Sequence, residues 1–284
     1  MELRLSTVTI AKNEEEHLAR VLKSVSDLAD EIIVVDAEST DRTSDVARRF
    51  TEKVFVRPWP GYGPQKNFAL RQATGDWVLF VDADEEVTPE LAAEIRTTLK
   101  RLPPRTTVGF VKIVTEFLGR PLRHLWGTNP RLLRRGEARW QDRAIHEQVV
   151  RPDGSVVRLG DPDTALVHAF LNHPSHYQTL AAYVRKRERY TLRDAEEMLE
   201  TGFDRIGKPV GDPLRSPLAT VRFLFERALK QFARLFVKKS GFLDGWRGWL
   251  WCFLSAQYEY LMCKKYLMLK KWEDERQQAK GNRQ

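Results

Sequence analysis

The sequence contains few cysteines: only Cys252 and Cys263 occur among 284 residues. So low a number excludes a disulfide scaffold and a four-cysteine zinc site, and it fits a reducing compartment. The N-terminus lacks the apolar segment and cleavage site of a secretory signal. No stretch reaches the roughly 18 uncharged apolar residues that a membrane-spanning helix needs. These absences favour an intracellular globular protein.

Residues 1–210 carry no net charge. Residues 211–284 carry 15 Lys and Arg against seven Asp and Glu, which accounts for the whole net charge of +8. A nucleic-acid binder would need basic residues interleaved with aromatics in its sheet domain, so the composition argues against a nucleic-acid partner. We expect two regions, a catalytic domain over 1–210 and a basic, aromatic-rich helical region over 211–284.

Strand and helix patterns alternate along the first 110 residues. Such alternation predicts an α/β fold with a mostly parallel, Rossmann-like sheet, whose ligands bind at the carboxyl ends of the strands. The four expected strands of this part are 6–10, 31–35, 54–56 and 77–81.

Helix starts are expected at several polar signals. Asn13 should cap a first helix whose buried stripe begins at Leu18, and Thr88 should cap another that has Pro89 at its first position. Residues 59–64 are expected to form a loop on their glycine and proline content. Farther along we expect strands at 108–114, 156–159 and 165–169, helix from 175 to 199, a linker over 202–217, and helices over 217–239 and 246–272.

Acidic residues follow successive expected strands. Asp36 and Asp41 come after the second, and Asp82-Ala-Asp-Glu85 comes after the apolar run WVLFV. Two carboxylates at Asp-x-Asp spacing lie on one side of a strand tip, where hard cations such as Mg²⁺ or Mn²⁺ take oxygen ligands. The pattern therefore predicts a divalent metal site at this edge of the sheet.

Four segments resemble a known family: TVTIAKNEEEHL, EIIVVDAESTDRT, GYGPQKNFALRQATGDWVLFVDADEEVTPEL and AIHEQVV. They are similar to the family 2 glycosyltransferases, which are inverting enzymes of the GT-A fold. The closer likeness is to bacterial enzymes that add a sugar, often β-linked glucose, to the lipopolysaccharide inner core. This likeness continues through LVHAFL, VRKRERYT and FVKKSGFLDGWRGWLW, so it covers nearly the whole chain.

The resemblance implies roles for particular residues. Asp36 would contact the nucleotide base, Asp84 would hold the divalent metal on the diphosphate, and Asp82 would face the ribose or a metal-bound water. His168, in LVHAF, would contact the metal or the diphosphate, against the alternative of a structural histidine at a strand end. Further donor contacts are implied at Ala11, Asn13, Glu14, Ser39, Lys66, Ala83 and Arg131.

An inverting transfer needs one base that removes the proton from the attacking hydroxyl. Glu147, Asp142 and Glu116 are candidates, and we favour Glu147 because the pair His146-Glu147 matches the subgroup. Asp142 is the second choice. The alternative is that Glu147 is a solvated strand residue and that His146 only packs.

Basic residues near these acids have two interpretations each. Lys66 would meet a donor phosphate or sugar, or else would be an exposed first-turn lysine; its neighbours Gln65 and Asn67 match the subgroup. Arg131 and Arg134 could clamp a diphosphate or an anionic acceptor bidentately.

The basic C-terminal region has an amphipathic pattern. On a helix over 223–239, apolar residues gather on one face and four basic residues occupy much of the rest, which suits an anionic membrane surface. The alternative is packing on the catalytic domain or on a second subunit. The apolar set is Leu224, Phe225, Ala228, Phe232, Leu235 and Phe236, and the basic set is Arg227, Lys230, Arg234 and Lys238.

The sequence thus predicts a metal-dependent inverting glycosyltransferase, peripheral to the cytoplasmic face of the bacterial inner membrane. It would move a hexose, glucose by resemblance, from a nucleotide-diphosphate sugar such as a UDP-sugar to a lipopolysaccharide-core or other lipid-linked saccharide. The alternatives are transfer to a polyprenyl phosphate and a membrane-associated sugar-nucleotide binder without catalysis.

Overall fold

A computed structural model describes residues 3–143, 147–173, 179–204 and 208–281, which form two compact units. The α/β unit comprises residues 1–115 and 126–175, and the helical unit comprises residues 116–125 and 176–284. The sequence led us to expect a boundary at residue 210, whereas the structure groups residues from 176 onward with the C-terminal helices.

A mixed sheet forms the centre of the α/β unit, with strand order β3-β2-β1-β4-β8-β6-β11-β5. β3, β2, β1 and β4 are parallel to one another, β8 is antiparallel to both β4 and β6, and β11 is parallel to β6. Most strands therefore run in one direction, which confirms the predicted α/β class. The strands are β1 (Leu5–Ala11), β2 (Glu31–Asp36), β3 (Val54–Val56), β4 (Trp77–Phe80), β5 (Glu86–Val87), β6 (Val108–Phe117), β7 (Arg120–Pro121), β8 (Gly127–Arg134), β9 (Arg139–Trp140), β10 (Val149–Val150) and β11 (Thr164–His173).

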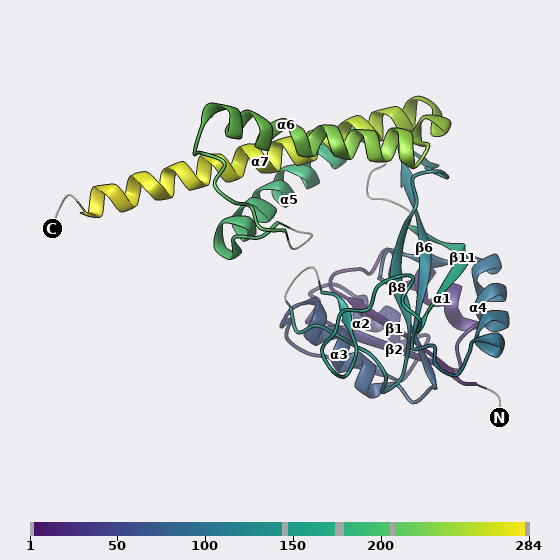
Figure 1. The fold of residues 1–284 in the computed structure, drawn as a ribbon. Coiled ribbons are helices and arrows are strands. Elements are labelled where there is room, and N and C mark those ends of the chain that lie inside the picture. Colours follow the sequence, from purple (N-terminus) through teal and green to yellow (C-terminus); the bar gives the residue numbers. More distant parts are fainter. Residues whose placement is uncertain (1–2, 144–146, 174–178, 205–207, 282–284) are drawn as a thin grey trace. The chain divides into compact units, whose positions relative to one another are not determined.

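Helices cover both faces of this sheet (Figure 1). Side chains alternate along each strand, so Val78 and Phe80 face one core, which includes Ala69 of α3, while Trp77 and Leu79 face another. The second core receives the apolar stripes of α1 and α4. The helices of this unit are α1 (Leu18–Ser26), α2 (Thr43–Arg48), α3 (Tyr62–Gln72) and α4 (Pro89–Arg101).

Several local predictions are confirmed. The buried residues of α1 are those expected, namely Leu18, Val21, Leu22 and Val25. The Thr88 side chain accepts a hydrogen bond from the Leu91 N–H, and Pro89 opens α4. Both features depend on residues within one or two turns, which is why sequence alone suffices for them.

Three local predictions are wrong. Asn13 does not cap α1, which begins at Leu18; Asn13 instead has a left-handed φ of 56°. α3 begins at Tyr62 inside the expected loop, because Pro64 falls in the first turn, where a helix needs no N–H from it. Residues 156–159 form no strand, and only an isolated bridge joins Val156 to Val150.

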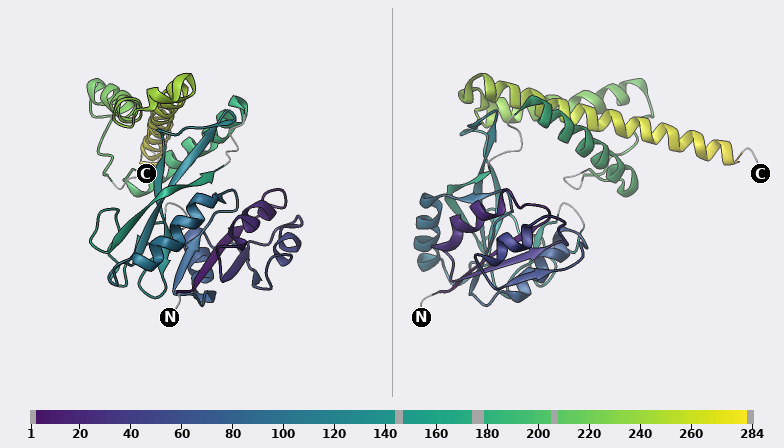
Figure 2. Two further views of the ribbon diagram at one scale, coloured as in Figure 1. Left: turned by 90° about the vertical axis from the view of Figure 1, so that its right-hand side faces the viewer. Right: turned by 180° about the vertical axis from the view of Figure 1, so that it is seen from behind.

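In the helical unit, α7 contacts both α5 and α6, as the two further views of Figure 2 also show. α5 belongs here because Ala195 and Met198 pack in one cluster with Met262 and Cys263 of α7. No helix in the described part of the chain has an apolar stretch long enough to cross a bilayer. The elements are α5 (Leu180–Thr201), α6 (Pro217–Ala233), a π-helical turn (Arg234–Lys238), a 3₁₀ turn (Gly241–Asp244) and α7 (Gly245–Gly281).

The apolar face expected over 223–239 is divided in the structure. Leu235 is buried and Leu224 packs into the cluster between α5 and α7, so one edge of the face is internal. Phe225 is 48% exposed, and it lies on the same side of α6 as the exposed Val221 and Leu229. The basic side of α6 is also partly turned inward, because Arg227 pairs with the buried Asp204.

Candidate active site

The carboxyl ends of β1 and β2 carry a tightly hydrogen-bonded loop pair. Asp36 is buried, and its carboxylate accepts hydrogen bonds from the Ser39 N–H at 3.0 Å, the Ser39 hydroxyl at 2.5 Å and the Ser44 hydroxyl. Asn13 crosses to the same loop, since its Oδ1 accepts from the Thr40 N–H at 2.8 Å. Asp36 thus anchors this loop, and its predicted contact with a nucleotide base stays a prediction.

The Asp-x-Asp turn after β4 is held by a buried arginine. Arg131 lies on β8, and its guanidinium donates to Asp82 at 2.7 Å and to Glu85 at 2.6 Å. Glu85 also accepts the Asp82 N–H at 3.0 Å. Burial raises the pKa of Glu85 above its usual range, although Arg131 acts in the opposite direction. Arg131 therefore positions this turn, instead of lining open space as a clamp for phosphate.

Lys66 joins this turn to the favoured base. Its ammonium group lies 2.6 Å from Glu147 Oε1 and 4.0 Å from Asp82 Oδ1. It also sits over the Trp140 ring, 4.3 Å from the centroid, so a cation–π contact adds to the two ion pairs. Lys66 is buried, which contradicts its interpretation as an exposed first-turn lysine.

The next residue of α3 holds the second candidate base. Asn67 donates to Asp142 Oδ1 at 2.9 Å and to the Trp140 carbonyl at 2.8 Å. The two candidates differ in environment, because the side chain of Glu147 is 11% exposed and that of Asp142 is 68% exposed. Asp142 lines a cavity of about 700 Å³ on the side of Asn67 and Arg139.

A glycine lets α3 approach the segment that carries both candidates. A Cβ at Gly63 would lie 1.8 Å from the Gln141 carbonyl oxygen, so no other residue fits without a shift of the backbone. The Gly63 N–H also donates to the Arg143 carbonyl at 3.1 Å. The predicted partner of Glu147, His146, lies outside the described residues, as do Ala144 and Ile145.

Negative charge gathers beside Asp84. Burial and the carboxylates of Asp84 and Asp41 raise the pKa of Glu14 to about 7. Glu14 is placed there by its own N–H, which donates to the Thr43 hydroxyl at 2.8 Å. Among the described residues, no three His, Cys, Asp or Glu side chains are arranged to hold a metal ion by themselves. A cation here would need oxygen ligands from a bound molecule as well.

The remaining predicted residues are distributed as follows. Ala11 and Ala83 are buried at the ends of β1 and β4, next to the acidic groups. His168 lies on β11, where its N–H donates to Glu94 of α4 at 2.7 Å. Arg134 donates to the Pro104 carbonyl, and Glu116 belongs to the helical unit.

Two residues of this arrangement were not predicted. Glu85 was seen only as part of an acidic cluster, and its burial against Arg131 requires the pairing of β4 with β8. Trp140 was not singled out, although the aromatic residue preceding the acidic segment was a possible signal. The structure brings together Asp82, Glu85, Arg131, Lys66 and Glu147 in one chain of ion pairs.

The chain is similar to a known family and to several glycosyltransferases. The family model described as glycosyl transferase family 2 matches residues 6–151. An uncharacterized glycosyltransferase of Rickettsia typhi is 51% identical over 92 residues, which are 32% of this chain and 32% of that protein. This chain therefore spans about a third of the length of the Rickettsia relatives that it matches.

A second relative aligns along nearly the whole chain. The lipopolysaccharide core biosynthesis glycosyltransferase LpsC of Rhizobium meliloti is 29% identical, covering 91% of this chain and 93% of that protein. Among solved structures, glucosyl-3-phosphoglycerate synthase of Mycobacterium tuberculosis, in complex with Mg²⁺ and UDP, is 28% identical over 38% of this chain and 43% of that one, with a TM-score of 0.34.

Proposed function

The chain belongs to glycosyl transferase family 2, and from this premise we propose that it is a metal-dependent inverting hexosyltransferase. The donor in this proposal is a nucleotide-diphosphate sugar, such as UDP-glucose. The acceptor is a lipopolysaccharide-core or other lipid-linked saccharide, which the similarity to LpsC along most of the chain supports.

One observation carries the proposal: Lys66 contacts both the candidate base Glu147 and Asp82 of the Asp-x-Asp turn. A transfer reaction needs the proton acceptor and the groups that face the leaving diphosphate within one small volume. Lys66 Nζ supplies that connection, and a cation beside a leaving phosphate stabilises the negative charge that develops there.

Donor binding is assigned to the strand ends that surround Asp36 and Asp84. The nucleotide lies, in this proposal, at the loop of Ala11, Asn13 and Ser39, which Asp36 holds in shape. Ala83 and Asp82 face the sugar end of the donor in this proposal.

A divalent metal fits the donor set at this edge. Asp84 and Asp82 offer carboxylate oxygens, the ligands that Mg²⁺ and Mn²⁺ prefer, and Glu14 is close enough to Asp84 for that carboxylate to raise its pKa. Asp82 also pairs with Arg131, so we assign the metal chiefly to Asp84, with diphosphate oxygens completing the shell. When bound, the metal stabilises charge on the departing diphosphate. His168 takes no part in this version of the site.

Glu147 is the base in this proposal. Its carboxylate accepts the proton of the attacking hydroxyl, while Lys66 orients it through the 2.6 Å contact. Asp142 is the alternative base, since Asn67 holds it near the same segment.

Two isosteric variants separate these candidates. Glu147→Gln keeps size and hydrogen bonding but cannot take the proton, so turnover should fall about 10²–10⁴-fold. Nucleotide binding should stay near wild type. Asp142→Asn should change turnover little, and the measurement is initial transfer rate from UDP-glucose to a delipidated core oligosaccharide with Mn²⁺.

The other outcomes are informative. A loss confined to Asp142→Asn would reassign the base. Transfer to polyprenyl phosphate but not to the oligosaccharide would change the acceptor class. Donor binding by the wild type without hydrolysis or transfer would favour a sugar-nucleotide binder without catalysis.

We also propose that the helical unit attaches the protein to the cytoplasmic face of the inner membrane. α6 exposes Val221, Phe225 and Leu229 along one side, and α7 exposes Trp246 and Trp249 near its start. Bulky aromatic and aliphatic side chains beside basic residues suit an interface with anionic lipid. Arg227 is excluded from this surface because it pairs with the buried Asp204 at 2.7 Å.

Vesicle co-sedimentation tests this attachment. Val221→Ser with Leu229→Ser and Trp249→Ser should lower the pelleted fraction on anionic vesicles, and salt should weaken wild-type binding without abolishing it. Leu159→Ser, at an exposed leucine of the α/β unit, is the control. If wild type stays in the supernatant at low salt, the apolar surface serves another purpose.

A further inference from the structure

The outer side of α5 in the helical unit carries basic side chains without an acidic one among them. Arg185, Lys186, Arg189 and Arg193, here called the basic stripe, line a cavity of about 540 Å³ together with Tyr190. Their spacing of three and four residues places them on one side of the helix. Within the described parts of the chain, Arg185, Arg189 and Arg193 form no ion pair.

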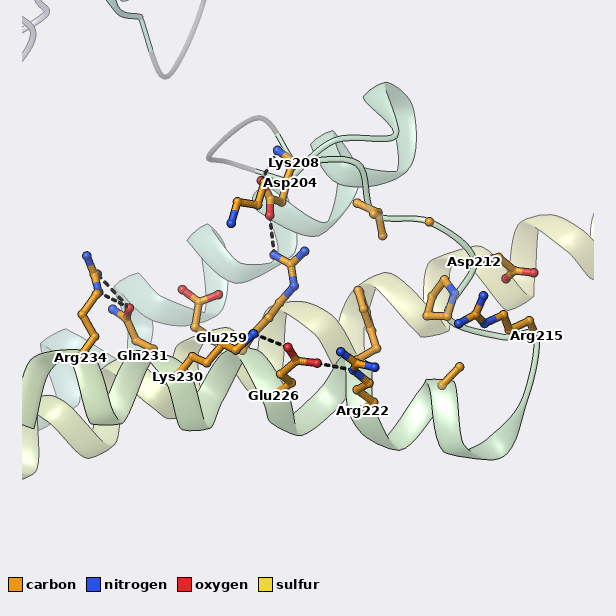
Figure 3. A pocket seen from close by; sticks show the side chains of 16 residues that line it. Asp204, Lys208, Asp212, Arg215, Arg222, Glu226, Lys230, Gln231, Arg234 and Glu259 are labelled. Atoms are coloured by element: carbon orange, nitrogen blue, oxygen red, sulfur yellow. Dashed lines mark hydrogen bonds and ion pairs between the residues drawn. The ribbon is translucent and has the colours of Figure 1, made fainter. Parts of the chain in front are cut away.

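A second cavity of the helical unit differs in this respect. It measures about 680 Å³ and lies along α6, where Figure 3 shows its charged side chains. Arg227 pairs there with Asp204 at 2.7 Å, and Arg222 and Lys230 both pair with Glu226. The cations of that cavity are thus largely neutralised from within, whereas the arginines of the basic stripe are not.

An aromatic pocket adjoins the basic stripe. It measures about 300 Å³ and is lined by Tyr183 and Tyr190 of α5 and by Trp251 and Tyr258 of α7. Ser255 adds a hydroxyl group. Several fixed contacts shape the walls: the Tyr183 and Trp251 rings are 5.8 Å apart, and the Tyr258 hydroxyl donates to Asp194 at 2.6 Å.

The basic stripe and the aromatic pocket share residues. Lys186 and Tyr190 line both, and Tyr190 is 45% exposed at the boundary between them. The ammonium group of Lys186 lies 5.6 Å from the centre of the Tyr190 ring. A single ligand can therefore contact aromatic rings and guanidinium groups together.

We propose that the basic stripe and the aromatic pocket bind the anionic saccharide part of the acceptor. Aromatic rings pack against the apolar faces of sugar rings, and a few polar groups fix their orientation. Guanidinium groups pair bidentately with phosphate or carboxylate. One sugar unit occupies the pocket, and its negatively charged neighbours lie along the stripe. This inference rests on the proposed transfer to a saccharide acceptor.

The pocket is the reason to choose a saccharide over a bilayer surface. A bilayer surface is contacted by exposed apolar and basic side chains, such as those of α6, and it does not need a concave pocket lined by aromatic rings. The pocket volume lies at the lower end of the range for small-ligand sites, which suits one ring of a longer oligosaccharide.

The test uses the full chain with the triple variant Arg185→Gln, Arg189→Gln and Arg193→Gln. Its matched control is Lys264→Gln, Lys271→Gln and Arg276→Gln, which removes the same charge from exposed positions of α7. Calorimetry measures binding of a delipidated, phosphorylated core oligosaccharide and of its dephosphorylated form. Kinetics measure the acceptor KM, kcat and donor hydrolysis without acceptor.

The triple variant should bind the phosphorylated oligosaccharide roughly 10- to 100-fold more weakly, with a matching rise in acceptor KM. Its kcat and donor hydrolysis should equal those of the control. Tyr190→Ala should weaken binding of both oligosaccharides, because a sugar ring loses its contact whatever the charge.

Other results overturn the inference. Equal binding by the triple variant and the control would remove the stripe from acceptor recognition. A loss of vesicle binding with unchanged oligosaccharide binding would assign the stripe to the membrane. If wild type transfers sugar to no acceptor, the proposed function fails, and direct oligosaccharide binding still decides whether this site exists.

Discussion

Strand β1 of the α/β unit and helix α6 of the helical unit place their side chains in opposite ways. All seven residues of β1 are buried, whereas none of the 17 residues of α6 is. The α/β unit also encloses charge, since Arg131, Glu85 and Lys66 are buried and paired. The helical unit also has buried clusters, but α6 exposes Val221, Phe225 and Leu229, and the arginines of the basic stripe on α5 are exposed as well. The proposed reaction site thus lies in the unit that encloses charge, and the proposed binding surfaces lie in the unit with exposed side chains.

The largest effect should come from Asp84→Asn, which tests whether the two units have separable roles. Loss of the assigned metal ligand should lower transfer and Mn²⁺-dependent donor binding by about 10³-fold or more. Vesicle binding and the free energy of unfolding should not decrease. Initial rates across an Mn²⁺ titration measure the first effect.

The control for that separation is Trp249→Ser, which should reduce vesicle binding and leave transfer to a soluble acceptor intact. Wild-type turnover in Asp84→Asn would contradict the metal assignment. A loss of vesicle binding in Asp84→Asn would contradict the separation.

The second prediction compares one internal ion pair in each unit. Arg131→Met leaves Glu85 buried without its cation, so the free energy of unfolding should fall by about 3–5 kcal/mol. Arg227→Met should lower the free energy of unfolding by only about 1–2 kcal/mol. The Asp204 carboxylate would still accept the hydrogen bond from the Lys208 N–H at 2.8 Å. Urea unfolding of each variant measures both losses.

A double variant completes this comparison. Glu85→Met combined with Arg131→Met removes both charges and should restore part of the lost stability. Equal losses for Arg131→Met and Arg227→Met would show that the two units depend on internal charge to the same degree.

The smallest effect concerns pH and compares Glu31 with Glu226. Burial raises the pKa of Glu31, but hydrogen bonds from Lys53, Ser6 and Thr74 outweigh it and lower the pKa to about 2. This folded-state pKa lies below the unfolded value, so the stabilisation is present above about pH 4.5 and is lost as pH falls toward 2. Glu31→Gln should cost about 2 kcal/mol at pH 7 and progressively less in acid.

Glu226 provides the exposed counterpart. Side-chain hydrogen bonds from Arg222 and Lys230 lower its pKa to about 2 as well, yet solvent screens this surface group. Glu226→Gln should therefore leave the free energy of unfolding unchanged across the same pH series. A pH-dependent loss in Glu226→Gln as large as that in Glu31→Gln would contradict this distinction between enclosed and exposed charge.

Features that depend on neighbouring residues followed from the sequence. The strand before Asp82, the cap at Thr88 and the buried stripe of α1 each arise from spacing within a few residues, so local pattern is enough. The start of α3 was missed because Gly61 and Pro64 are compatible with both a loop and a first helical turn.

The sequence identified the residues of the candidate site but not the contacts between them. Asp84, Lys66, Glu147 and Arg131 were all named from the sequence, but their relations were not. That Arg131 serves Asp82 and Glu85 instead of facing open space follows from its burial on β8. The burial of Arg131 could not be predicted from the sequence, because it stands between the polar segment before it and two leucines after it.

The sequence by itself determined the alternation of strands and helices over the first 110 residues, the acidic turn after β4 and the family resemblance. Only the tertiary structure decided which charges meet. Lys66 and Glu147 are 81 residues apart, and Arg131 and Asp82 are 49 apart. The structure likewise divided the face of α6 and placed α5 beside α7. Such contacts depend on which strands pair and how helices pack, and those choices minimise the free energy of the whole chain instead of any one segment.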